Sequence, residues 1–266
     1  MSASALDQFQ LVNEKGWRRG LGNMLRGEYS SWFKSSRWIK HLLIWFAIIN
    51  GMMGIMIIAT IKERGGGPPL LLMYGIFGGM CVAIGVMIIM QRVLVREKQK
   101  GTAAWVLSKP VTRTAFVVSR LFVNSIAILL TSVIVPGLIL YISLGFSYLG
   151  WLSPLGFATA LLMVILHTFY WIALVLMMGT LSESSSSVIA VPMALYFGFW
   201  IGTTMFPQLV YISPLSLTFV PGQYNSLAGS LMTGEPVFSW LPLTLTVVSC
   251  VIFIAVALWR FNRQEF

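Results

Sequence analysis

The chain has 266 residues, of which 57% are hydrophobic and only 10% are charged, and its formal net charge is +10 at pH 7. Soluble domains carry about a quarter of charged residues, and several apolar runs here exceed the roughly 18–20 residues that cross a bilayer, so an ordinary soluble protein is excluded. The positive charge would also fit nucleic-acid binding. In a membrane protein it more often reports orientation and contact with anionic lipid, so we expect membrane lipid and no nucleic acid as partners.

The first 40 residues are polar and basic and show no cleavable signal. Within residues 17–38, apolar and aromatic side chains recur at helical spacing on one face, and most basic side chains occupy the other. Trp17 and Trp32 supply aromatic anchors, and Glu28 is the acid of this stretch. The pattern predicts an N-terminal amphipathic helix that lies in the membrane interface. The alternative is an ordinary basic stretch beside the membrane.

Six apolar runs follow and predict an all-α integral membrane protein with six transmembrane helices. The third run is too long for a simple crossing, so we expect it to begin outside the membrane or to bend at Pro136. Gly75 and Gly79 in the second run have the small-xxx-small spacing of close helix packing. The predicted spans are residues 41–61, 70–90, 115–146, 156–179, 188–206 and 240–259.

The basic residues are distributed unevenly along the chain. Seven of the eighteen lie in residues 1–40 and six in 91–113, while the connections 147–155 and 207–239 contain none. The positive-inside rule therefore puts both termini and the 91–113 segment in the cytoplasm. The proline-rich connection 207–239 then lies outside, where its short apolar stretches predict re-entrant helices covered by protein.

The sequence lacks the usual motifs of enzymes and of ATP binding. No HExxH, GxSxG or GxxxxGK[ST] is present, the spans hold no paired carboxylates, and Cys81 and Cys250 lack CxxC spacing. We therefore expect no catalytic residues, no metal site and no cofactor in this chain.

Three polar side chains inside the spans are candidates for a transport pathway or for helix packing. His167 can be a proton relay, but a buried histidine is more often satisfied by a neighbouring hydroxyl or carbonyl. For Asn50 and Asn124 we expect interhelical hydrogen bonds first and substrate contacts second. The spans thus carry no visible energy source, so any work must be delivered by a partner.

The charged segment after the second span fits neither a span nor a plain loop. Gly101 can end the emerging helix, Thr102 can cap a new one, and Pro110 can end it. Residues 103–107 would then form a short cytoplasmic helix suited to a groove on another protein, with Trp105 as its anchor. Alternatively, Trp105 lies among the lipid headgroups.

This segment resembles the permease subunits of the type-2 class of ABC exporters. Their pattern is "E…GT…LS.P(V/L)(S/T)R", and "LRGEYSSWFKSSRW", "ISPLSLTF" and "WRFNRQEF" extend the resemblance over nearly the whole chain. The residues that match the pattern are Glu97, Gly101, Thr102, Ser108, Pro110, Val111 and Arg113.

The resemblance implies a single permease domain over residues 1–266 in the cell membrane. It implies a cytoplasmic N-terminus (1–40), a six-span region (41–260), a cytoplasmic coupling segment (91–115) and an outer re-entrant segment (207–239). Such permeases form dimers, bind separate cytoplasmic ATPase subunits that hold ATP and Mg²⁺, and pass substrate along the dimer interface, with spans two and five along the path. The coupling residues it implies are Glu97, Gly101, Thr102, Trp105, Leu107 and Pro110.

Three functions follow from these observations. The first is the membrane subunit of an ATP-driven exporter, the second a non-transporting assembly or anchoring protein, and the third an ion-coupled carrier that depends on His167. The mostly apolar spans are compatible with lipids, drugs, peptides or glycan carriers, and with a homodimer or a pair of related permeases.

Overall fold

Six long apolar helices make up most of the structure. The computed structural model describes residues 16–62, 69–221 and 225–264, which contain helices and no strand. Each of the six is long and apolar enough to cross a membrane, which confirms the six predicted runs. They are Arg37–Lys62, Leu70–Gln99, Arg113–Gly145, Pro154–Leu181, Ser185–Met205 and Leu241–Asn262. Their ends shift by at most four residues, except that the second helix continues nine residues beyond the predicted span and includes the short helix α7 (Val95–Gln99).

The first three spans are each interrupted by a π-helical turn. In the third span, the turn η4 (Leu130–Ile134) stands directly before Pro136. A proline inside a helix cannot donate to the residue four positions before it, and a wider turn relieves the clash of its ring. The other pieces are α3 (Arg37–Phe46), η2 (Ala47–Gly51) and α4 (Met52–Lys62), then α5 (Leu70–Tyr74), η3 (Gly75–Cys81) and α6 (Val82–Met90), then α9 (Arg113–Leu129) and α10 (Val135–Gly145).

The fourth span, α11 (Pro154–Leu181), is the centre of the bundle. It is the most buried of the six, and it contacts α6, α9, α12 (Ser185–Met205) and α14 (Leu241–Asn262). Trp171, near the middle of α11, is fully buried. The outward faces of the first, fifth and sixth spans stay apolar and uncovered, as expected of helices that meet lipid or another subunit.

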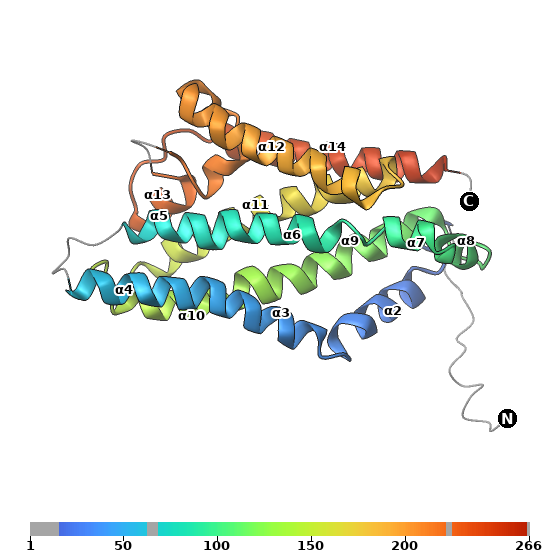
Figure 1. The fold of residues 1–266 in the computed structure, drawn as a ribbon, viewed down its shortest axis with the longest axis horizontal. Coiled ribbons are helices and arrows are strands. Elements are labelled where there is room, and N and C mark those ends of the chain that lie inside the picture. Colours follow the sequence, from blue (N-terminus) through green and yellow to red (C-terminus); the bar gives the residue numbers. More distant parts are fainter. Residues whose placement is uncertain (1–15, 63–68, 222–224, 265–266) are drawn as a thin grey trace.

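The N-terminal helix is shorter than the sequence pattern predicts. Instead of one helix over residues 17–38, there is a 3₁₀ turn η1 (Gly16–Arg18), the helix α2 (Leu21–Phe33) and a bend before α3. Gly20 separates η1 from α2 because its φ of +80° belongs to the left-handed region that L-residues avoid. Trp17 therefore lies outside the amphipathic helix, contrary to the prediction. Figure 1 shows α2 at the same end of the bundle as the C-terminal end of α14.

In the segment 207–239, residues 207–221 and 225–239 contain short helices at the other end of the bundle (Figure 1). They are η5 (Pro207–Tyr211), η6 (Pro214–Leu217) and α13 (Leu227–Thr233). All four residues of η6 are buried, and α13 packs on α11. The two glycines of the second span pack against this segment and not against another span, because a Cβ on Gly75 would lie 2.2 Å from the Thr218 carbonyl oxygen, and one on Gly79 2.5 Å from the Thr218 hydroxyl.

Gly75→Ala is expected to destabilise the protein by about 1–3 kcal/mol, since the added methyl group meets a backbone oxygen that cannot rotate away. Thermal unfolding of the purified protein in detergent measures this. Gly54→Ala is the matched control, because Gly54 also lies in a span and a Cβ there meets nothing within 4 Å. Equal melting temperatures for Gly75→Ala and Gly54→Ala would contradict the close contact with Thr218.

Candidate functional site

The N-terminal half of α9 receives contacts from three other parts of the chain. At its start, the Thr112 hydroxyl accepts from the amide of Ala115 at 3.1 Å, which caps the helix. The same hydroxyl donates to the Trp17 carbonyl at 2.6 Å, and the Thr112 amide donates to the Arg19 carbonyl at 3.1 Å. These bonds fix residues 16–20 to the first turn of α9.

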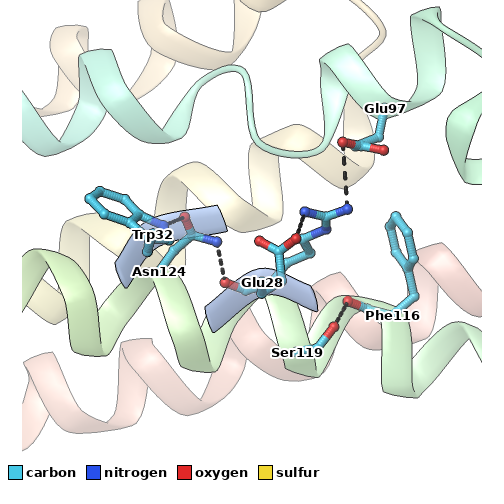
Figure 2. Close-up of polar contacts among 7 residues, drawn as sticks. Glu28, Trp32, Glu97, Phe116, Ser119 and Asn124 are labelled. Atoms are coloured by element: carbon cyan, nitrogen blue, oxygen red, sulfur yellow. Dashed lines mark hydrogen bonds and ion pairs between the residues drawn. The ribbon is translucent and has the colours of Figure 1, made fainter. Parts of the chain in front are cut away.

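Helices α2 and α9 are joined by two pairs of polar residues. Glu28 and Trp32 are four residues apart on α2, and Arg120 and Asn124 are four apart on α9, so each pair shares one helix face. The Trp32 indole donates to the side-chain oxygen Oδ1 of Asn124 at 2.8 Å (Figure 2), beside the ion pair between Glu28 and Arg120. The Asn124 amide also donates to the Arg120 carbonyl at 2.8 Å. Glu28, Trp32 and Asn124 are all buried.

Arg120 also reaches a second acid, from the other side of the site. Its Nη2 lies 3.5 Å from a carboxylate oxygen of Glu97, which belongs to the short helix α7 (Val95–Gln99) (Figure 2). The Arg120 side chain is only 14% exposed, and its guanidinium lies 5.3 Å from the centre of the Phe116 ring. We call Glu28, Trp32, Glu97, Arg120 and Asn124 the Arg120 cluster. It ties α2, α7 and α9 together.

Helix α7 is held to the body of the protein by its polar side chains. The Lys98 ammonium donates to the Thr180 carbonyl at 3.1 Å, and the Gln99 amide donates to the Glu183 carbonyl at 2.8 Å. Gly101 follows with φ +68°, and a second short helix, α8 (Thr102–Leu107), begins directly after it. The predicted cap is wrong in one respect: Thr102 is the first helical residue, and Gly101 occupies the capping position without a side chain to cap with.

Helix α8 has one face on the protein and one face outward. Ala103 is buried, and Val106 and Leu107 pack against the hydrophobic core. Trp105 is 61% exposed, and the Lys109 ammonium lies 3.6 Å from the centre of its ring. Pro110 follows the end of the helix, as predicted. The result is a short, firmly seated helix that presents a tryptophan at the same end of the bundle as α2 (Figure 1).

The end of the last span closes on the same part of α9. Phe261 of α14 stacks on Phe116, with 5.5 Å between ring centres and 7° between ring planes. The Arg113 guanidinium donates to the Asn262 carbonyl at 2.6 Å. The sixth span therefore shares the anchor that holds α2 and α7.

The other two polar span residues lie away from this cluster. The His167 Nδ1 lies 3.0 Å from the Pro214 carbonyl, and its Nε2 accepts from the Trp171 indole at 3.3 Å. Because an indole can only donate, the ring proton of His167 is on Nδ1. The Asn50 amide lies in the π turn of the first span, and neither its oxygen nor its nitrogen has a hydrogen-bond partner among the described residues.

A second histidine has the same arrangement and was not singled out from the sequence. The Trp45 indole donates to His41 Nε2 at 3.1 Å, so His41 Nδ1 donates to the Thr131 hydroxyl at 2.6 Å. This bond joins the first span to the π turn of the third. The tryptophan lies four residues after the histidine in both cases, a spacing that the sequence could have revealed.

The structure brings together four of the residues named from the sequence: Glu28, Trp32, Glu97 and Asn124. Sequence reasoning missed the residue between them, Arg120, which was counted only as one more positive charge. The available signal was that Arg120 interrupts an apolar run four residues before Asn124. A charge at that place is costly unless it is paired.

A family profile described as "ABC-2 family transporter protein" matches residues 22–266, which include all six spans and all of α2 except its first residue. No curated protein matches the chain. The match confirms the resemblance seen in the sequence. The chain therefore belongs to the ABC-2 family of transporter proteins and is a multi-pass, non-catalytic membrane permease.

Proposed function

We propose that this permease is the membrane subunit of an ATP-driven exporter, and that a separate cytoplasmic ATPase subunit docks on α8. The observation that carries this proposal is the exposure of Trp105 on a helix that is otherwise fixed to the protein. An exposed aromatic side chain on a helix that is packed against the protein is a typical anchor of an interface. ATP and Mg²⁺ would bind to the partner, so this chain needs no site for them.

The Arg120 cluster supplies a path for the force. Movement of α8 would be passed through α7 to Glu97, then to Arg120 on α9 and to Glu28 on α2. Ion pairs with little exposure are stiff links, because separating them leaves unpaired charges in a poorly hydrated place. In this mechanism, closure of the ATPase subunits moves the third span and α2 as one body.

The distribution of the basic residues favours one orientation of the bundle in the membrane. Residues 16–40, the segment 91–115 and the end of α14 contain most of the basic residues and lie at one end of the bundle, which we assign to the cytoplasm. There α2 would lie in the membrane interface, while the segment 207–239 would dip into the membrane from the outer side, its backbone covered by α11 and α14. A second permease, identical or related, would complete a substrate path lined by spans two and five. Each chain would form a single permease domain.

The competing functions have less support. The geometry of His167 disfavours an ion-coupled carrier, because both ring nitrogens already have partners inside the protein. In a non-transporting assembly or anchoring protein, Trp105 would contact a partner protein or lie among the lipid headgroups. No force from an ATPase would then be transmitted. Identification of what co-purifies with the protein in mild detergent separates this alternative: an ABC ATPase supports the exporter.

Trp105→Asp is expected to leave the permease in the membrane but to abolish co-purification of the ATPase subunit and stimulation of its ATP hydrolysis by the permease. A charged residue cannot fill an apolar pocket on the partner. Because Trp105 is exposed, the permease itself should melt as the wild type does.

Trp105→Phe is the matched control, and it should keep most of the binding because the aromatic ring is retained. Undiminished ATPase stimulation by Trp105→Asp would remove α8 from the docking surface and overturn this part of the proposal.

Arg120→Met is expected to destabilise the permease by about 3–5 kcal/mol, because it leaves Glu28 buried without its partner. Arg120→Met combined with Glu28→Gln and Glu97→Gln removes all three charges and should recover most of the thermal stability. The combined variant should still bind the ATPase through Trp105, yet fail to stimulate it. Recovery of stimulation along with stability would show that the Arg120 cluster is structural and does not transmit force.

A further inference from the structure

A polar cleft of about 370 Å³ lies beside the Arg120 cluster. Its walls come from α2, from the start of α3, from the end of the second span with α7 and α8, and from α9. The charged residues that line it are Arg37, Arg92, Arg96, Arg120, Glu28 and Glu97. The walls from α2, from α7 and α8, and from α9 belong to the path that connects α8 to α2.

The charges of this cleft are not balanced. Both carboxylates are already paired with Arg120. In the part of the chain that the structure describes, the guanidinium groups of Arg92 and Arg96 form no ion pair and no hydrogen bond, and that of Arg37 only lies against the Trp32 ring, at 5.1 Å from its centre. Like charges gathered around a cleft repel one another, and an anion between them relieves this repulsion.

The residue type indicates which anion. Guanidinium groups bind phosphate oxygens with paired, planar hydrogen bonds, and several arginines around one cleft can surround a phosphate from different sides. The volume exceeds that of a bare phosphate ion and leaves room for the group that carries it.

The position indicates where the anion comes from. Arg37 begins the first span, and Arg92 follows the last residue of α6 by two positions. Residues at the ends of membrane helices lie at the depth of the lipid headgroups, and basic pockets between such ends are a known form of anionic lipid recognition.

We propose that this cleft is a binding site for a phosphate ester, and that its natural ligand is the headgroup of an anionic phospholipid. The ligand bridges α2 to the end of the second span, next to Glu97. This assignment rests on the cleft alone and does not require that the protein exports anything.

The test measures the melting temperature of the purified full chain in a neutral detergent, and lipid binding by native mass spectrometry. The probes are dioleoylphosphatidic acid and dioleoylphosphatidylcholine, with sn-glycerol 3-phosphate and inorganic phosphate as soluble alternatives. Phosphatidic acid should bind better than phosphatidylcholine and raise the melting temperature of the wild type.

The variant Arg92→Gln/Arg96→Gln should lose at least tenfold in affinity for phosphatidic acid. Without lipid it should melt at the wild-type temperature or slightly above, because repulsion in the cleft is reduced. Arg260→Gln/Arg263→Gln is the matched control: it removes two exposed charges at the same end of the bundle but outside the cleft, and should bind like the wild type. The single variants Arg92→Gln and Arg96→Gln give intermediate losses and serve if the double variant does not fold.

Equal losses in the two double variants would overturn the proposal, since binding would then depend on total charge. No preference of the wild type for phosphatidic acid would also overturn it. If only the soluble phosphates bind, and only when Arg92 and Arg96 are present, the phosphate site stands and the lipid source is wrong.

Discussion

A single guanidinium group, that of Arg120 on α9, holds two carboxylates from separate parts of the chain. Glu28 comes from the helix that precedes the first span, and Glu97 from the helix that follows the second. None of these three charges would be stable alone with so little exposure to water. Their mutual pairing therefore fixes how α2 and α7 lie on α9, and the positions of α8 and of the cleft follow from it.

The Arg120 cluster also connects α8, where the ATPase subunit is proposed to dock, with the membrane spans. In the proposed mechanism, work enters through a surface that is both exposed and firmly connected to the spans. Trp105 meets the first condition and α7 the second. The end of the sixth span stacks on Phe116 next to the cluster, so a displacement there reaches a third membrane helix as well.

Much of the fold could be predicted because its signals are local. The length of an apolar run predicts a span, and Gly101 and Pro110 predict a short helix between them, which the structure places at Thr102–Leu107. The predicted N-terminal helix is too long, because the helical spacing of apolar residues continues through Gly20. The left-handed conformation of Gly20 breaks the helix. The π turns were not predicted, because their sequences are as compatible with an α-helix as with a π turn.

The site was harder to predict, because its pairs depend on tertiary structure. Glu28 and Arg120 are 92 residues apart, and the local sequence around one does not identify the other as its partner. The distance is bridged only when α2 folds back on α9. Asn124 was expected to bond between helices, and it does so with Trp32. The spacing of Gly75 and Gly79 indicates close helix packing but not the partner, which is Thr218 at the end of η6. The partner could not be predicted, because the short apolar stretches of the segment 207–239 do not show where in the bundle they lie.

The central claim of the proposed mechanism is that α8, the third span and α2 move as one body when the ATPase subunit changes state. Spin labels at Ala104→Cys on α8 and Arg26→Cys on α2, both exposed positions, allow the distance between them to be measured in the assembled transporter, with Cys81 and Cys250 replaced. With ATP or ADP bound, this distance should stay constant while the distance from Ala104→Cys to a label at Leu155→Cys, on α11, changes. A nucleotide-dependent change between Ala104→Cys and Arg26→Cys would contradict the claim.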